Sequence, residues 1–241
     1  MKITVLGCNG LYPADEINTS GYLLSAENFN MVLDMGSGVF SALQKIIKPE
    51  RVNLIFISHL HFDHISDLGV YNYYLESKAK RGEFSGKIKL LVKNDESAVY
   101  RAIAGLNYFE IEEYGDEIKE IYGAKLEFYK MNHPVLSHAV TVQIGDKTFG
   151  YLGDGNVSDN LKRVISLSDL TVAHAPFFKV QADSSKPHAS AFEIARIASE
   201  LKKRVLISHF MPGCDMQALS DEIEFAREYL TLVTQGKSYL V

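Results

Sequence analysis

The stretch of sequence that decides the fold and the chemistry of this chain is His59-Leu60-His61-Phe62-Asp63-His64. Three of the chain's eight histidines fall within these six positions, together with one aspartate. Imidazole nitrogen and carboxylate oxygen are natural ligands of Zn2+ and similar ions. The stretch follows residues 52–57, a mostly apolar run that is typical of a strand buried on both faces. We interpret it as a set of metal ligands rather than a chance cluster of surface histidines.

The spacing within this stretch allows it to serve two metal positions. In an extended loop after a strand, residues 59 and 61 point to the same side, because side chains alternate with a period of two. If a helix begins near residue 63, Asp63 and His64 turn towards a second point nearby. We therefore expect two adjacent ions at this loop.

Apolar runs and turn residues on either side of the stretch predict alternating strands and helices. The predicted strands are residues 2–6, 22–25, 29–33, 52–57, 87–92, 126–131, 139–144, 148–152 and 204–207. The predicted helices are residues 39–47, 68–80 and 95–106, and a further one that begins at the capping box Ser190-Ala191-Phe192-Glu193.

Four of the predicted strands are followed by a residue that can bind a metal. Residues 54–59 and 205–209 share one layout, an apolar run that ends in Ser-His, and His133 and Asp154 follow two other strands. Open α/β sheets usually place their sites at the carboxyl ends of strands. The repeated layout suggests two similar half-domains that face each other.

Length, composition and cysteine content limit the class of protein. The 241 residues, of which 46% are hydrophobic and 23% charged, contain no linker-like tract and indicate one domain over residues 1–241. No apolar run approaches the roughly 18 residues that span a bilayer, and residues 3–6 are too short for a signal-peptide core. With only two cysteines, Cys8 and Cys214, the chain is expected to be cytoplasmic and its thiols reduced.

The charge of the chain bears on its partners. A net charge of −5 argues against a long nucleic acid, because neutralising phosphates requires a basic surface. The short basic clusters at residues 78–81 and 202–204 are interpreted as solvated helix ends. We therefore expect a small-molecule substrate and no membrane partner.

The pattern His-x-His-x-Asp-His resembles the signature of the metallo-β-lactamase fold superfamily. Other parts follow in that family's order: Asp34 in Leu-Asp-Met-Gly, His133 in Asn-His-Pro, Asp154 in Leu-Gly-Asp-Gly and His209 in Ile-Ser-His-Phe. The resemblance extends over residues 7–212. It implies an α/β fold, a four-layer αββα sandwich with two mixed sheets inside, helices outside and metals at one edge.

The resemblance also implies how the ligands are divided between two divalent ions. His59, His61 and His133 would hold one ion, Asp63, His64 and His209 the second, and Asp154 would bridge both. Asp34 would orient a ligand from behind, with a turn or capping aspartate as the alternative. A turn aspartate is likewise the alternative for Asp154. Zn2+ is the expected metal, with Mn2+ or Fe2+ as alternatives because all ligands are nitrogen or oxygen.

His188, in Lys-Pro-His188-Ala-Ser, resembles the extra histidine of the ribonuclease Z branch, which contacts the scissile phosphate or the leaving group. A loop histidine without a catalytic role is the alternative. His174 stands where that branch has a glutamate paired with the extra histidine, so the usual proton relay is in doubt. His138 matches no ligand position. The expected catalytic residues are therefore Asp63, which would help to orient the nucleophile, and His188.

These features together predict a metal-dependent hydrolase, a phosphodiesterase that attacks a small or cyclic nucleotide-type phosphodiester with a hydroxide shared by the two ions. The segment between His133 and Asp154 holds only a short hairpin, with no room for the long arm by which ribonuclease Z grips tRNA. Processing of tRNA 3′ ends remains an alternative. So does hydrolysis of a lactone, thioester or β-lactam, with residues 71–74 lining an apolar pocket, although packing of a helix face explains these tyrosines equally.

Two further expectations rest on relatives. The diiron members of this fold have a glutamate where this chain has His61 and carry a fused flavin domain, so their redox chemistry is not expected here. Dimers are common among related proteins, and a homodimer is the implied assembly.

Overall fold

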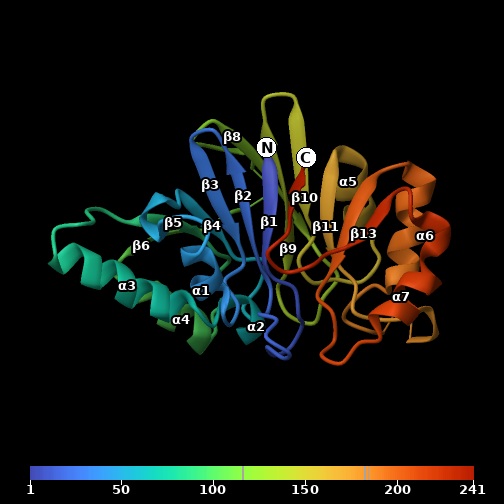
Figure 1. The fold of residues 1–241 in the computed structure, drawn as a ribbon. Helices are drawn as coiled ribbons and strands as arrows, with labels where there is room; N and C mark the ends of the chain where they lie inside the picture. The colour runs from blue at the N-terminus through green and yellow to red at the C-terminus, as the bar shows by residue number, and fades with distance from the viewer. Residues whose placement is uncertain (116, 182, 184) are drawn as a thin grey trace.

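The computed structural model describes residues 1–115, 117–181, 183 and 185–241, and within these the strands form two seven-stranded sheets (Figure 1). The first sheet has the order β14-β1-β2-β3-β4-β5-β6. Its strands are β1 Lys2–Gly7, β2 Gly21–Ala26, β3 Phe29–Leu33, β4 Leu54–Phe56, β5 Ile88–Leu91, β6 Phe109–Glu112 and β14 Ser238–Leu240.

The second sheet has the order β13-β12-β11-β10-β9-β8-β7. Its strands are β7 Lys119–Ile121, β8 Ala124–Lys130, β9 His138–Ile144, β10 Lys147–Tyr151, β11 Leu170–His174, β12 Arg204–Ser208 and β13 Leu230–Leu232. The helices are α1 Val39–Gln44, α2 Phe62–Ile65, α3 Leu68–Lys80, α4 Ala98–Ala104, α5 Asp159–Leu167, α6 Ala191–Leu201 and α7 Met216–Glu222, with 3-10 turns at Pro49–Arg51, Lys179–Gln181 and Glu224–Ala226.

The two sheets repeat one topology. In each sheet four strands pair antiparallel and the next three pair parallel, so that β14-β1-β2-β3 corresponds to β7-β8-β9-β10, and β4-β5-β6 corresponds to β11-β12-β13. The half-domains suggested by the sequence therefore exist. However, the strand that corresponds to β4 is β11, which ends at His174, and not β12, which precedes His209. The repeated Ser-His ending marks strands at different places in the two sheets.

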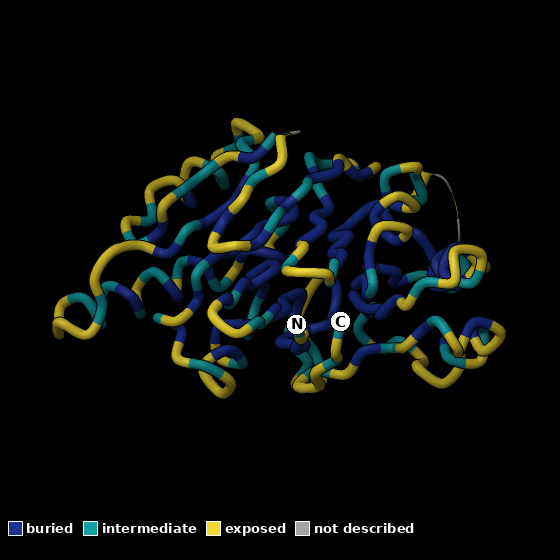
Figure 2. Tube along the Cα trace, turned by 90° about the horizontal axis from the view of Figure 1, so that it is seen from above, coloured by how far each residue is buried: buried dark blue, intermediate teal, exposed yellow. Residues whose placement is uncertain are grey.

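Alternation along the strands divides the core between two faces of the first sheet. In β1 and β2, Ile3, Val5 and Tyr22 face the second sheet, whereas Leu6 and Leu23 face the outer helices α1, α3 and α4. Both faces are apolar because both are covered, one by a sheet and one by helices. Figure 2 shows the buried chain running through the middle of the molecule, with exposed segments on the periphery.

The predicted αββα sandwich is confirmed, and the differences in detail have local causes. The helix expected over residues 39–47 ends at Gln44, where the amides of Lys45 and Ile46 donate to carbonyls three residues back, as in the bond from Ile46 N to Leu43 O of 3.0 Å. The helix over residues 68–80 and the capping box at Ser190 and Glu193 are found as predicted. The strands β6, β7, β11, β13 and β14 and the helices α5 and α7 were not predicted.

The carboxyl ends of the central strands and the short helix α2 lie together along the lower edge of the molecule in Figure 1. The segment after β3 fixes α2 by backbone hydrogen bonds, from Met35 N to His64 O at 2.7 Å and from Asp67 N to Met35 O at 3.0 Å. Gly36 packs so closely here that a Cβ would collide with the carbonyl oxygen of Asp63. A glycine is therefore required where this segment crosses α2.

We predict that Gly36→Ala destabilises the metal-free protein by about 1–3 kcal/mol, as overpacking against rigid backbone does. The matched control is Gly69→Ala in α3, where an added Cβ meets nothing within 4 Å. That change removes a helical glycine and should stabilise by about 0.5–1 kcal/mol. Urea unfolding followed by circular dichroism measures both, and equal stability of the two variants would contradict the close packing at residue 36.

Candidate metal centre

Side chains from both sheets meet at this edge, each placed at the end of a strand or on α2. His59 follows β4, and α2 carries Asp63 and His64 immediately after His61. From the second sheet, His133 follows β8, Asp154 follows β10, and His209 follows β12. The structure thus brings together all seven residues expected to bind metal.

The first group of donor atoms surrounds one point. His59 Nε2 lies 2.9 Å from His61 Nδ1, and His133 Nε2 lies 3.5 Å from the same Nδ1. Asp154 Oδ2 lies 3.5 Å from His59 Nε2. His61 and His133 are partly exposed, whereas His59 and Asp154 are buried. The four residues can hold a metal ion together.

The second group shares the same oxygen of Asp154. Its Oδ2 lies 3.4 Å from His64 Nε2 and 3.6 Å from His209 Nε2. Asp63 Oδ2 lies 3.5 Å from His64 Nε2 and 3.7 Å from His209 Nε2. Asp63 is fixed by the backbone N–H of Leu11, which donates to its Oδ2 at 2.9 Å.

These separations fit divalent cations. Ligands about 2.0–2.1 Å from a tetrahedral zinc ion lie about 3.3 Å from one another, close to the distances in both groups. His64 Nε2 is buried and has no hydrogen-bond partner within the described residues, although a buried polar nitrogen normally has one. A cation between the donors would satisfy it. The residues therefore fit a pair of metal ions that share Asp154.

The pKa shifts of Asp154 and His64 also indicate a site for a cation. Burial opposes the charge of Asp154, yet the surrounding His209, His64 and His59 hold its pKa well below the usual value. Burial opposes a proton on His64 as well, but Asp154 and Asp34 hold the pKa of His64 well above 6.5. The carboxylates thus draw a positive charge onto the point where a metal would lie.

The pKa values of the other two buried histidines of the donor groups, His59 and His209, are shifted in the direction opposite to that of His64. Burial, followed by the repulsion of His64, holds the pKa of His59 well below 6.5, and burial does the same for His209. Both imidazoles are therefore neutral at pH 7, with a lone pair available for a metal.

A second layer of contacts fixes the direction in which the imidazoles face. Asp34 accepts a hydrogen bond from His64 Nδ1 at 2.6 Å, and Ser20 Oγ lies 2.8 Å from His209 Nδ1. His133 Nδ1 donates to the carbonyl oxygen of Pro187 at 3.0 Å. Each of these bonds occupies Nδ1 and leaves Nε2 directed into the site. Asp34 therefore holds His64 Nδ1 and directs Nε2 of the same ring into the site.

Backbone strain is concentrated at two of these positions. Asp34 has φ 58° and His209 has φ 67°, in the left-handed region that residues other than glycine rarely adopt. Both residues are buried. Strain of this kind persists only where the surrounding structure imposes it, and it is often found at functional sites.

His188 lies beside both donor groups. Its Nε2 is 3.8 Å from Asp154 Oδ2, and its ring centroid lies 5.4 Å from that of His133 and 5.2 Å from that of His209. Its Nδ1 is buried without a hydrogen-bond partner within the described residues. Burial lowers the pKa of His188 to about 4, so the ring is neutral at pH 7.

His174 is a member of the site that the sequence did not assign. It stands at the end of β11, and its Nδ1 lies 2.7 Å from Asp154 Oδ1. It could be grouped with His64, Asp154 and His209 as a further donor. Its position at the end of an apolar strand, like that of His59, was the signal available in the sequence.

Comparison with known proteins identifies the family. The family model described as the anti-Pycsar protein Apyc1 matches residues 1–239. The chain belongs to the Apyc1 family. Apyc1 membership and the buried histidine and aspartate groups confirm the predicted enzyme class, a metallo-hydrolase.

This chain is similar to the probable metallo-hydrolase YhfI of Bacillus subtilis. The two sequences are 29% identical over 222 residues, which cover 88% of this chain and 87% of YhfI. The crystal structure of YhfI, a metallo-β-lactamase fold protein, matches with a TM-score of 0.93 at 24% identity, covering 99% of this chain and 98% of that chain. The short form of human tRNase Z matches with a TM-score of 0.77 at 20% identity, covering 100% of this chain and 99% of that chain. These matches confirm the fold. The resemblance to ribonuclease Z is confirmed over a segment of 69 residues, 28% of this chain, that is 38% identical to a ribonuclease Z of Treponema denticola.

Within the residues that the structure describes, none of the helices is both long and apolar enough to cross a membrane.

We predict that Asp34→Asn weakens the binding of one of two Zn2+ ions by about 10–100-fold, as loss of a partner behind a metal ligand typically does. The side-chain amide of the introduced asparagine is uncharged, so it accepts a weaker hydrogen bond from Nδ1 of His64 than the carboxylate does. Metal content after equilibration with a graded series of chelators measures the effect. Asp169→Asn is the control, because Asp169 belongs to neither donor group and accepts a hydrogen bond of 2.8 Å from the backbone N–H of Thr148. Retention of both ions by Asp34→Asn at native affinity would refute the role of Asp34.

Proposed function

We propose that the chain is a dinuclear metal-dependent phosphodiesterase that acts on a small cyclic nucleotide-type substrate. The observation that carries the proposal is the single oxygen, Asp154 Oδ2, shared by two donor groups of tetrahedral dimensions. We assign His59, His61 and His133 to one ion, Asp63, His64 and His209 to the other, and Asp154 to both. Zn2+ is the proposed metal.

Two divalent cations held in this way supply Lewis acidity, which lowers the pKa of water and neutralises charge on a phosphate. The side chains of the protein position the attacking water and the substrate. Asp63 is 9% exposed, and the Leu11 N–H holds its Oδ2, so this carboxylate is fixed at the edge of the site. We assign to it the orientation of the attacking water, by accepting a hydrogen bond from it.

His188 is proposed to act on the leaving oxygen. Because its pKa is lowered to about 4, it is neutral at pH 7 and stabilises that oxygen through a donated N–H rather than as a permanent cation. An anionic phosphate nearby raises the pKa and favours transfer of a proton to the leaving group.

Three features support a small substrate. The hairpin between β9 and β10 turns at residues 145–146, so the arm that would hold tRNA is replaced by a tight turn. The net charge is −5, which disfavours a long polyanion. The Apyc1 family is associated with the degradation of cyclic nucleotides.

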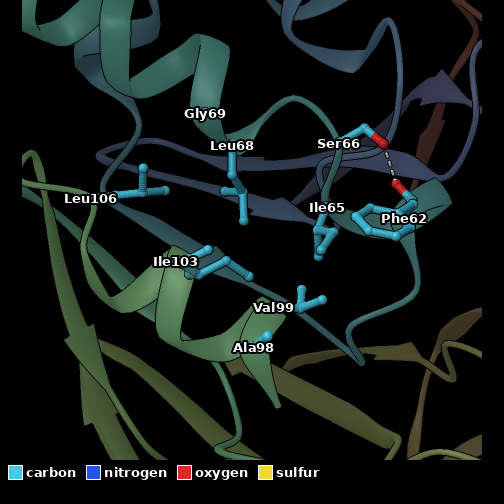
Figure 3. Close-up of a pocket in the computed structure, with 10 residues that line it drawn as sticks. Phe62, Ile65, Ser66, Leu68, Gly69, Ala98, Val99, Ile103 and Leu106 are labelled. Atoms are coloured by element: carbon cyan, nitrogen blue, oxygen red, sulfur yellow. Dashed lines mark hydrogen bonds between the residues drawn. The ribbon is translucent and has the colours of Figure 1, made fainter.

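Hydrolysis of a lactone, thioester or β-lactam is the second candidate, and a cavity favours it. An apolar pocket of about 470 Å³ lies between α2 and α4, with Ile65, Val99 and Ile103 directed into it (Figure 3). The lining includes Phe62, on the helix that carries Asp63 and His64. Tyr71 does not line it and instead packs in the core, its hydroxyl donating to the carbonyl oxygen of Pro49 at 2.6 Å.

A substrate panel tests the proposal with purified, Zn2+-loaded protein. Cyclic mononucleotides and bis-p-nitrophenyl phosphate should be hydrolysed, whereas a precursor tRNA, a lactone and a thioester should not. Cleavage of the lactone or thioester alone would replace the proposal with the second candidate. A gel-visible tRNA product whose yield collapses with salt would replace it with tRNA processing.

We predict that His188→Ala keeps both ions and loses at least tenfold in phosphodiester hydrolysis, a conservative limit when acid–base groups contribute about 10²–10⁴. His138→Gln is the matched control, since it changes a histidine outside both donor groups and should leave the rate within about twofold of native. If His188→Ala retained full activity on cyclic nucleotides, His188 would have no role in the step.

A further inference from the structure

We infer that His174 is a positioning residue that holds Oδ1 of Asp154, so that Oδ2 alone faces both metal positions. The carboxylate of Asp154 can only accept a hydrogen bond, so Nδ1 of His174, 2.7 Å from Oδ1, is the donor. The inference rests on the proposed ligand role of Asp154 and is independent of the substrate.

Asp154 needs such an anchor because its backbone contact, a hydrogen bond of 2.8 Å from Ser137 Oγ to its carbonyl oxygen, does not fix the rotation of the carboxylate. It lies between Gly153, with φ 58°, and Gly155, in the loop after β10. A rotation of the carboxylate would allow both oxygens to bind one ion and leave the other ion one ligand short. With Oδ1 engaged by His174, the shared oxygen stays 3.4 Å from His64 Nε2 and 3.5 Å from His59 Nε2.

His174 is itself rigidly held. It is buried at the end of β11, and its ring stacks on that of His209 at a centroid separation of 4.6 Å and an interplanar angle of 12°. Its Nε2 lies 3.0 Å from the hydroxyl of Tyr22, which lies 2.6 Å from Ser208 Oγ. A chain of hydrogen bonds therefore runs from Ser208 through Tyr22 and His174 to Asp154.

The same contacts argue against two other roles. A metal ligand needs a free lone pair directed at the ion, but Nδ1 carries the proton given to Asp154, and Nε2 faces Tyr22 away from the site. A relay partner of His188 would need a bond to it, and within the described residues no hydrogen bond or ion pair joins His174 to His188. The histidine that replaces the glutamate of the ribonuclease Z branch thus serves Asp154 instead.

The first test measures Zn2+ affinity by chelator competition, without any substrate, in three variants. In His174→Ala, which removes the donor, the weaker of the two ions should bind about 10–100-fold less tightly. In His174→Asn the side-chain amide can still donate to Oδ1, so most of the affinity should be restored. Tyr22→Phe removes only the hydroxyl behind His174 and should have a smaller effect in the same direction.

The second test uses Co2+-substituted protein, whose visible absorption reports the number of ligands. A positioning role predicts two bound Co2+ ions with a native-like spectrum in His174→Asn, which keeps a donor to Oδ1 of Asp154. Loss of one ion from His174→Asn together with a change of coordination would show that the imidazole of His174 is a ligand and overturn the inference. Equal loss of affinity in the Ala and Asn variants would overturn it too, because the hydrogen bond would then be irrelevant.

Folding failure of His174→Ala does not remove the test, because Tyr22→Phe keeps the aromatic ring and His174→Asn keeps a polar donor in the place of Nδ1. Circular dichroism establishes their folding, and loss of affinity in His174→Asn with none in Tyr22→Phe would reject the chain of bonds. If the phosphodiesterase assignment fails, the Zn2+ measurements stand unchanged. If it holds, His174→Ala should lower kcat at least about tenfold and change KM less, with recovery in His174→Asn.

Discussion

The carboxylate of Asp154 is the group on which the rest of the site depends. One of its oxygens lies within 3.4–3.6 Å of Nε2 of three histidines, and these come from β4 and α2 on one sheet and from the end of β12 on the other. A buried ionised carboxylate costs several kcal/mol unless cations face it. The two sheets end at one edge, where these histidines face the carboxylate, and a cation bound there would add to the stability of the sandwich.

The repeated topology explains how one chain supplies both the ligands and their supports. β3 and β10 correspond, and each is followed by an aspartate, Asp34 or Asp154. β4 and β11 correspond as well: His59 follows β4, and β11 ends at His174. In the first sheet His59 is one of the donor residues, whereas Asp34 supports the site through its hydrogen bond with His64. In the second sheet Asp154 is the donor residue, whereas His174 supports it through a hydrogen bond. The same strand layout is used with the roles reversed.

The fold was expected from the resemblance to the metallo-β-lactamase superfamily. The meeting of the donor residues was also indicated by the residues themselves, because an apolar run followed by a histidine or aspartate locates a side chain at a strand end. It was not sufficient for the role of His174, which has the same local pattern as His59. The difference lies in Tyr22, whose hydroxyl is bonded to His174 but whose sequence pattern is that of an ordinary core residue. Periodicity gives the face on which a side chain lies and not the atom that it meets across the core. Short strands such as β7 were missed because three residues carry too little periodicity.

The surroundings of the donor groups bear on what can reach them. His59 and His209 are only 2% exposed, whereas His61 and His133 are partly exposed, so a substrate has to approach on the side of the latter pair. The exposed side chain next to His61 is Phe62, which is 69% exposed and apolar. A long nucleic acid obtains much of its binding energy from basic groups along its phosphates. The exposed side chain beside these donor residues is instead an aromatic ring, which offers a face on which a planar ring can stack.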